Sequence, residues 1–128
     1  MSNAVKIVLT SAIILLLGCA ASKHFAPLPK DMDLTTVPQD TITITAERYH
    51  FTPETIHVKS GTLLHITVKS IQGTHGFRLP DFDIDERLEE NIPKSIQIYF
   101  PEKGEFSFKC SHFCGIGHFG MNGKIIAE

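Results

Sequence analysis

The chain has 128 residues, which is enough for one domain and a tail. Its 12 basic residues nearly balance its 14 acidic ones. This balance excludes the strong basic excess by which nucleic-acid-binding proteins are recognised, so we expect no nucleic-acid partner. Apolar residues make up 42% of the sequence, as in a globular protein with a hydrophobic core, and tryptophan is absent.

Residues 1–18 have the features of an export signal. Lys6 and the α-amino group supply a positive charge ahead of an apolar run at residues 7–17. That run is too short to span a bilayer, which takes about 20 residues. The sequence Leu-Leu-Gly-Cys that ends at Cys19 resembles a bacterial lipobox, so we expect cleavage before Cys19 and acylation of its thiol. An ordinary signal peptide with an incidental cysteine, or an uncleaved short anchor, is the alternative.

Lipidation of Cys19 also explains the odd number of cysteines. An exported protein with three cysteines leaves one thiol unpaired, whereas acylation of Cys19 leaves Cys110 and Cys114 as a pair. Residues 19–40 hold three prolines and little hydrophobic periodicity, which is typical of a flexible, semi-extended tether. We therefore expect a periplasmic or otherwise extracytoplasmic protein that is anchored to a membrane through lipid.

From residue 41 to residue 128 the hydrophobic pattern has the period of β-strands, which predicts one folded domain. The expected strands cover residues 41–45, 55–59, 63–69, 95–100, 105–110 and 123–127. Short strands separated by turns with Gly and Pro predict an all-β fold, a small sandwich or barrel. Residues 81–91 are acidic and predict a helical turn or an irregular loop. We interpret their charges as a solvated surface; the alternative is a docking patch for a basic redox partner.

One stretch near the C-terminus concentrates soft or borderline metal donors. Cys110, Cys114, His118 and Met121 lie within twelve residues, and His75 lies upstream of them. Thiolate, thioether and imidazole ligands suit copper better than calcium or magnesium. A blue-copper ion takes one Cys, two His and a weak axial Met. The second cysteine therefore indicates two metal ions that share sulfur.

Two other interpretations of the cysteine pair compete with copper. An oxidising compartment permits a disulfide between Cys110 and Cys114, but a disulfide does not require His118 and Met121 immediately after it. Structural zinc would use two Cys and two His, usually in a tighter arrangement, and would leave the methionine redundant. The donor set favours copper over both.

The run Cys-Ser-His-Phe-Cys-Gly-Ile-Gly-His-Phe-Gly-Met at residues 110–121 resembles the C-x-x-x-C-x-x-x-H-x-x-M motif of the CuA domain. That domain occurs in cytochrome c oxidase subunit II and in nitrous oxide reductase. The resemblance covers residues 41–128, because residues 49–53, residues 58–61, a His-Gly-Phe sequence at His75 and the final Gly-Lys-Ile-Ile follow in the family's order. It implies a cupredoxin-like Greek-key β-sandwich.

The resemblance also implies the cofactor, two copper ions in a CuA centre, and a role for each donor. Cys110 and Cys114 would be bridging thiolates. His75 and His118 would each bind one copper through an imidazole nitrogen, and Met121 would be a weak axial ligand to one of them.

The remaining ligand in the family is a backbone carbonyl, which here belongs to His112. Oxidase subunits often carry Glu at this position, but a main-chain donor tolerates a histidine side chain. We expect the His112 imidazole to face solvent or the surroundings of the ligands. Four other histidines are interpreted as structural or surface residues: His24, His50, His57 and His65.

Two features of oxidase subunit II are expected to be missing here, namely its two membrane-spanning helices and its Trp-rich segment that receives electrons. Tyr49 and Phe51 fall where that segment would lie, and Phe113 and Phe119 flank the metal loop. We expect these four aromatic residues to take part in ordinary core packing. The chain thus resembles a stand-alone, lipid-tethered cupredoxin.

The expected function is to carry or relay single electrons, with a redox protein such as a c-type cytochrome, an oxidase or a reductase as partner. No nucleophile–base pair or open coordination position is indicated, so we do not expect an enzyme. The alternative is copper delivery during assembly of a CuA or other copper centre. The Sco chaperones also have a Cys-x3-Cys motif, but their fold is thioredoxin-like α/β. A mononuclear red-copper site with one spare cysteine would hold one copper per chain.

Overall fold

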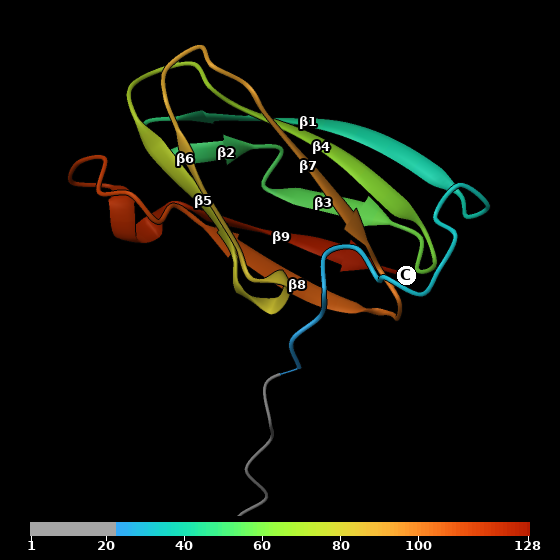
Figure 1. Cartoon of the computed structure of the whole chain (residues 1–128). Helices are drawn as coiled ribbons and strands as arrows, with labels where there is room; N and C mark the ends of the chain where they lie inside the picture. Colours follow the sequence, from blue (N-terminus) through green and yellow to red (C-terminus); the bar gives the residue numbers. More distant parts are fainter. Residues whose placement is uncertain (1–22) are drawn as a thin grey trace, which may run out of the picture.

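The computed structural model describes residues 23–128, so the export signal and Cys19 lie outside the described residues. Within this part the chain forms nine β-strands and two short 3-10 helices, and the strands make two sheets packed face to face (Figure 1). The predicted all-β sandwich is confirmed. Between residues 23 and 128 no helix has the length and apolar character needed to cross a membrane.

The first sheet has four strands in the order β2-β1-β4-β7. They are β1 (Gln39–Glu47), β2 (His50–Thr52), β4 (Leu63–Ser70) and β7 (Lys94–Tyr99). β1 and β4 run parallel, whereas the two outer pairs are antiparallel. Because parallel neighbours cannot be joined by a tight hairpin, the chain leaves this sheet between them and contributes a strand to the other sheet.

The second sheet has five strands in the order β3-β9-β8-β5-β6. They are β3 (Thr55–Val58), β5 (His75–Leu79), β6 (Ile84–Leu88), β8 (Gly104–Lys109) and β9 (Asn122–Ala127). The 3-10 helices η1 (Pro80–Phe82) and η2 (His118–Gly120) lie in the β5–β6 and β8–β9 connections. The six strands expected from alternation are all present, and β2, β5 and β6 are additional.

Residues 81–91 contain the edge strand β6, so the prediction of a helical turn or irregular loop is wrong for Ile84–Leu88, whereas residues 81 and 82 do lie in the 3-10 helix η1. β6 pairs antiparallel with β5, which places Ile84 opposite Leu79 and Leu88 opposite His75. An apolar spacing of four residues fits one face of a strand as well as one face of a helix, and the pairing with β5 selects the strand. Three carboxylates here each lie within 4.0 Å of a basic side chain: Asp85 near Arg78, Glu89 near Arg87 and Glu86 near Lys94.

Aromatic side chains fill the space between the sheets in two clusters. One cluster consists of Phe51, Phe77 and Phe108, with ring centroids 5.0–6.0 Å apart. The other consists of Phe82, Phe100 and Phe106, with centroids 5.2–5.4 Å apart. Aromatic contacts of this kind add to the stabilisation that burial provides, and here they stabilise the packing of the two sheets.

Residues 25–27, in the segment predicted as a tether, pack against the domain. The ring of Phe25 lies 5.4 Å from that of Phe82 and 5.9 Å from that of Phe106. The Phe25 amide donates to the carbonyl of Asp81 (2.8 Å), and the Tyr99 amide donates to that of Pro27 (2.9 Å). Residues 25–27 are therefore attached to the sandwich.

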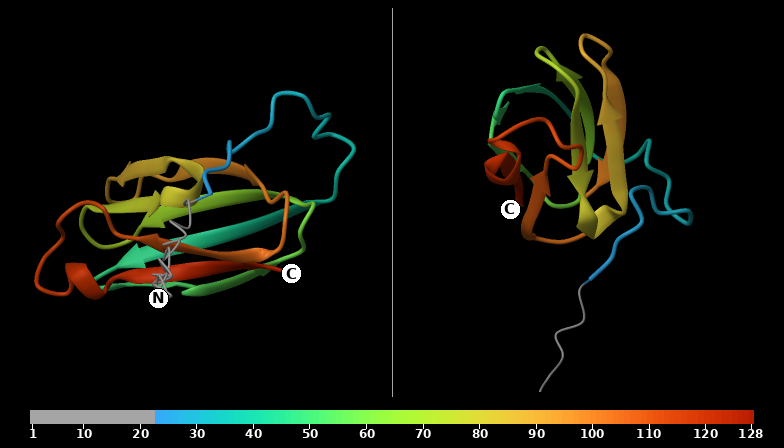
Figure 2. Two further views of the ribbon diagram at one scale, coloured as in Figure 1. Left: turned by 90° about the horizontal axis from the view of Figure 1, so that it is seen from below. Right: turned by 90° about the vertical axis from the view of Figure 1, so that its left-hand side faces the viewer.

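Three connections meet at one end of the sandwich, on the left of Figure 1 and toward the viewer in the right-hand view of Figure 2. They are the β1–β2 turn (residues 48–49), the β4–β5 loop (residues 71–74) and the β8–β9 loop (residues 110–121). The C-terminus lies at the opposite end. Every expected metal ligand is on or next to one of these connections.

Candidate metal centre

The β8–β9 loop folds back on itself so that its ligands converge. At its base the Cys110 amide donates to the carbonyl of Met121 (3.0 Å). Within the loop the His118 amide donates to the carbonyl of Gly115 (3.2 Å), and the Met121 amide to that of His118 (3.2 Å). This short 3-10 segment reverses the chain, which brings Cys114, His118 and Met121 back over Cys110.

The donor atoms form one compact group. The two thiol sulfurs of Cys110 and Cys114 are 3.7 Å apart. Cys110 Sγ lies 4.0 Å from Nδ1 of His75, and Cys114 Sγ lies 3.7 Å from Nδ1 of His118 and 3.9 Å from Sδ of Met121. His75, Cys110 and Met121 are buried and Cys114 is half-buried. The structure thus brings together all five side chains that the sequence singled out.

These spacings fit a metal better than a set of hydrogen bonds. Imidazole nitrogen and thiolate sulfur bind one ion at about 2.0–2.3 Å, so two such ligands lie about 3.5–3.8 Å apart. The Cys114–His118 distance falls in that range, and the Cys110–His75 distance is slightly longer. Both cysteines are free thiols. The donor set of two sulfurs, two imidazoles and a thioether suits copper.

His112 contributes its main chain to this group and not its ring. Its carbonyl oxygen is 3.1 Å from Cys110 Sγ, which places the oxygen beside the thiols. The imidazole lies instead near the guanidinium of Arg87, with Nη1 3.2 Å from Nδ1. The carbonyl of His112 therefore lies at the donor group, whereas its imidazole does not.

Replacing His112 with alanine is therefore expected to leave the visible copper spectrum and the copper content of the protein essentially unchanged, because the carbonyl remains. The measurement is a spectrum of the reconstituted variant beside that of the native protein. Loss of copper would show that the ring itself is a ligand.

A hydrogen bond to the backbone orients His75. Its Nε2–H donates to the carbonyl of Gln72 (2.6 Å), which leaves the lone pair of Nδ1 directed toward Cys110. Metal-bound histidines commonly use a second-nitrogen bond of this kind to hold the ring and the tautomer. Burial lowers the pKa of His75 below its usual value, so the imidazole is neutral and ready to bind at pH 7. The sequence contained no signal for the part played by Gln72.

Burial has the opposite effect on Cys114. Burial is the main cause that raises the pKa of the Cys114 thiol to about 11. The hydrogen bond to Cys110 and the charge of Cys110 act in the same direction. The metal-free protein consequently keeps this thiol protonated at neutral pH. Because thiolate is the ligand, metal binding must release that proton.

Gly76 allows β5 to approach the cysteine loop closely. Its amide donates to Cys110 Sγ (3.4 Å). A Cβ atom at this position would lie 2.8 Å from the backbone nitrogen of Ser111 and 2.7 Å from that of His112, closer than such atoms can pack. Any larger residue would push the ligand loop away from His75.

Apolar side chains surround the site on the outside. Phe113, Ile116 and Phe119 are 67%, 97% and 87% exposed, and we call these three residues the apolar rim. The rings of Phe113 and Phe119 flank the His118 imidazole, with centroids 5.5 and 5.1 Å away. The prediction that Phe113 and Phe119 belong to the core is wrong, because the loop that carries them projects from the sandwich. Phe51 is buried in the core, as predicted, and Tyr49 packs at its edge.

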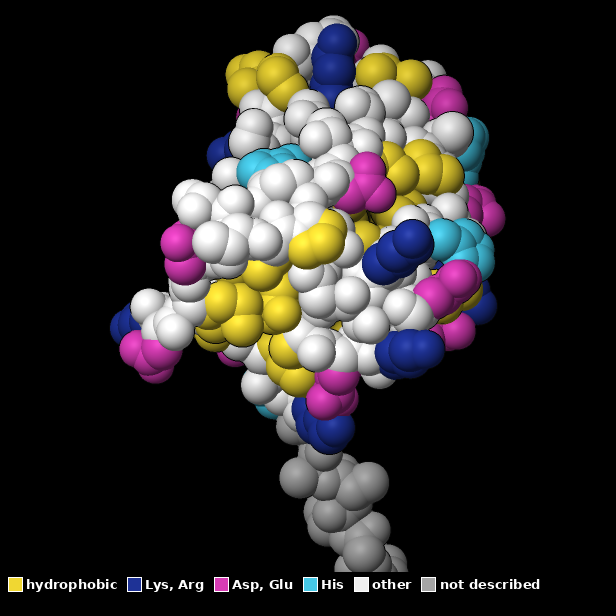
Figure 3. Space-filling view, turned by 90° about the vertical axis from the view of Figure 1, so that its right-hand side faces the viewer, with side chains coloured by type: hydrophobic (Ala, Val, Ile, Leu, Met, Phe, Trp, Pro, Cys, Tyr) yellow, Lys and Arg dark blue, Asp and Glu magenta, His cyan; other side chains and the backbone are white. Residues whose placement is uncertain are grey.

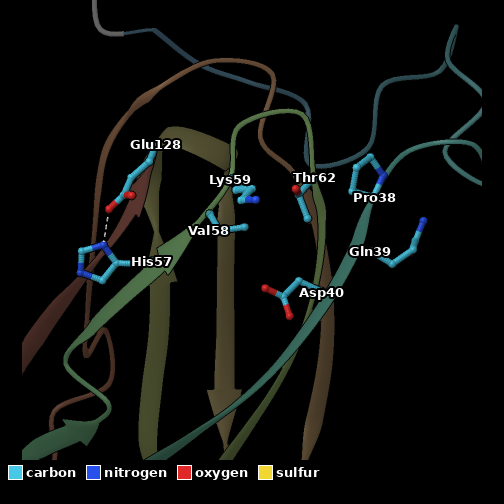
Figure 4. A pocket seen from close by; sticks show the side chains of 8 residues that line it. All are labelled: Pro38, Gln39, Asp40, His57, Val58, Lys59, Thr62 and Glu128. Atoms are coloured by element: carbon cyan, nitrogen blue, oxygen red, sulfur yellow. Dashed lines mark hydrogen bonds and ion pairs between the residues drawn. The ribbon is translucent and has the colours of Figure 1, made fainter.

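The opposite end of the sandwich has a hollow, and no cluster of metal ligands lies there among the residues that the structure describes. The hollow has a volume of about 390 Å³ and is lined by Pro38, Gln39, Asp40, His57, Val58, Lys59, Thr62 and Glu128 (Figure 4). His57 Nδ1 is paired with a carboxylate oxygen of Glu128 at 2.5 Å. Figure 3 shows positive and negative side chains intermixed over this face. Among residues 23–128, His75, Cys110 and Cys114 are the one group of three or more His, Cys, Asp or Glu with metal-ligand geometry.

Comparison with known proteins agrees with the fold. The family described as Cupredoxin-like domain matches residues 9–127. Over 90 residues the chain is 26% identical to two cytochrome c oxidase subunit 2 sequences of Thermus thermophilus; the match covers 70% of this chain and 67% and 54% of theirs. The chain therefore spans little more than half the length of the second relative.

Two further proteins are similar over the same region. A nitrous-oxide reductase of Ralstonia nicotianae is 26% identical over 92 residues, which is 69% of this chain but 14% of that enzyme. The crystal structure of the periplasmic domain of subunit II of the cytochrome oxidase of Bradyrhizobium japonicum superposes with a TM-score of 0.64. Its sequence is 18% identical, with 69% of this chain and 83% of that one covered. These comparisons confirm the resemblance to cytochrome c oxidase subunit 2 and to nitrous-oxide reductase.

Proposed function

This chain belongs to the family of cupredoxin-like domains, and from that premise we propose that it is a binuclear copper protein of the CuA type that carries single electrons. One observation carries the proposal. Two thiol sulfurs lie 3.7 Å apart, and each has its own imidazole nitrogen within 4.0 Å. A site for one blue-copper ion needs a single cysteine. Two cysteines, each with its own histidine, support two ions that share both sulfurs.

Each ligand has a defined part in this proposal. Cys110, Cys114, His75 and His118 would hold the two copper ions, and Met121 and the carbonyl of His112 would supply weaker contacts. When bound, the two copper ions supply a one-electron redox couple. The chain holds the ligands at strand ends and on the loop between two strands, next to a cluster of buried phenylalanines, and such a scaffold limits rearrangement on electron gain or loss.

The surroundings of His118 support electron exchange with another protein. Cys110 and Met121 are buried, whereas His118 is partly exposed between two rings of the apolar rim. Exposed apolar patches of this kind mark interaction sites. We propose that a redox protein, a c-type cytochrome, an oxidase or a reductase, docks on the rim with its own cofactor close to His118.

The proposed location is outside the cytoplasm, with Cys19 as the lipid-bearing residue. Support comes from the lipobox-like sequence at Cys19 and from the similar fold of a periplasmic oxidase domain. The lipid anchor would keep this electron carrier at the membrane surface, where membrane-bound oxidases and reductases accept electrons.

The test is the copper content of the reconstituted protein together with its visible and EPR spectra. We expect two copper ions per chain, a purple colour and a seven-line hyperfine pattern, because one unpaired electron would be shared by two copper nuclei. One copper per chain with four lines would contradict the proposal. Retention of copper against a chelator and reversible redox cycling are expected of a carrier; ready surrender of Cu(I) to an acceptor would favour the copper-delivery alternative.

A further inference from the structure

The β1–β2 turn touches both loops that carry the histidine and cysteine ligands. Arg48 and Tyr49 form this turn between β1 and β2. Tyr49 faces the β8–β9 loop, and Arg48 faces the β4–β5 loop. None of these contacts belongs to the ligand set itself.

Tyr49 lies against the backbone between two ligands. A Cβ atom added at Gly117 would fall 2.6 Å from Cβ of Tyr49, and one added at Gly115 would fall 2.9 Å from its Cε1. The tyrosine side chain therefore fills the space that side chains at these positions would need. Gly115 also has φ of +132°, which L side chains rarely adopt. The segment from Cys114 to His118 is thus pressed onto the tyrosine ring.

Arg48 reaches the other loop. Its backbone amide donates to the side-chain oxygen of Gln72 (3.3 Å), and its guanidinium would be 3.8 Å from a Cβ placed on Gly73. Gln72 is the residue whose carbonyl orients His75. Next to it, the Ile71 amide donates to the carbonyl of Ala46 (3.0 Å), at the end of β1. The β1–β2 turn is therefore connected to both histidine ligands through their loops.

We propose that Arg48 and Tyr49 are positioning residues that clasp the two ligand loops and set the separation of His75 from the Cys114–His118 segment. Loops are the least stable parts of a fold, yet a metal site requires its ligands to be held to within about 0.5 Å. Two adjacent residues in one turn, one against each loop, meet that requirement. The proposal rests on the proposed copper function for its consequence, but the clasp itself is a property of the metal-free protein.

A double-mutant cycle tests the clasp without copper. Gly117→Ala, Tyr49→Gly and the double variant are compared by urea unfolding of the metal-free protein. We expect Gly117→Ala to be much less destabilising when residue 49 is Gly, which also removes the Cβ atom that alanine would keep, a coupling of about tenfold or more in the unfolding equilibrium. Tyr49→Phe should behave as the native protein at Gly117, since ring carbons and Cβ make that contact. Additive effects within about twofold would overturn the proposal.

Amide exchange gives a second readout that does not depend on the folding of the Tyr49→Gly variants. In the metal-free Gly117→Ala protein we expect the Ile71 and Gly73 amides, on the other loop, to exchange about tenfold faster than in the native protein. Gly120→Ala is the matched control, because nothing lies within 4 Å of a Cβ there. Unchanged exchange at Ile71 and Gly73 would refute the connection between the loops.

The rate of copper loss then tests whether the contact of Tyr49 with the ligand loop stabilises copper binding. The Tyr49→Ala protein should lose copper to a chelator about tenfold faster than the native protein, with Tyr49→Phe restoring retention. Equal rates for Tyr49→Ala and the native protein would overturn the positioning role. If the native protein binds no copper at all, the proposed function fails, whereas the unfolding cycle and the amide exchange still decide whether the clasp exists.

Discussion

Replacing Cys110 with serine is expected to lower the copper content from two ions per chain to at most one. The hydroxyl is a hard donor that replaces the thiolate poorly for copper, and the shared-sulfur arrangement with Cys114 is lost. One cysteine, two histidines and a methionine remain, which is the ligand set of a mononuclear blue-copper site. Metal analysis and EPR measure the change, with the seven-line pattern replaced by four lines or by none.

The chain offers a matched control for this substitution. Cys19→Ser makes the same chemical change at the cysteine that we propose carries the lipid, so it should keep both copper ions and lose membrane attachment. Cys114→Ser should lose the binuclear spectrum as Cys110→Ser does. Retention of two copper ions by either loop variant would contradict the bridging role, and loss of copper in Cys19→Ser would contradict the assignment of Cys19.

Replacing Gly76 with alanine is expected to destabilise the metal-free protein by about 3 kcal/mol, in the range for overpacking at a buried position. The new Cβ would press on the backbone nitrogens of Ser111 and His112, which cannot rotate away as a side chain can. The ligand loop must then move from β5, which weakens the contact between the Gly76 amide and Cys110 Sγ. Copper retention should fall together with stability.

Urea unfolding of the metal-free protein measures this loss, and Gly120→Ala is its control. Gly120 lies in η2 on the same loop with open space around it, so its substitution should change stability by less than about 0.5 kcal/mol. Equal effects of the two substitutions would show that the close approach at Gly76 is not a constraint.

The strands that the sequence predicted are those whose two faces differ. In β4, Leu64, Ile66 and Val68 are buried and alternate with half-exposed residues, which makes the period of two visible. β5 has four of its five residues buried, so it has no alternation, and the short edge strand β6 is rich in charge. Both were missed because neither shows the alternation of a strand with one buried face.

The same limit applies to the aromatic residues around the site. Residue type predicted burial for Phe113 and Phe119, and the core does hold Phe51, Phe77 and Phe108. Whether an aromatic residue on a loop enters the core depends on where the loop projects, which is a property of the assembled sandwich. The packing of Phe25 onto the second aromatic cluster is decided in the same way.

The sequence by itself determined the chemistry of this protein: two thiols, two imidazoles and a thioether in a spacing that a single loop can close, with His75 supplied from elsewhere. Donor identity is a property of residue type, so it can be recognised before folding is considered. The tertiary structure alone decided how these donors meet and what holds them. Gln72, Gly76 and the Arg48–Tyr49 turn act through contacts between segments distant in the chain, and such contacts exist only once the two sheets have packed.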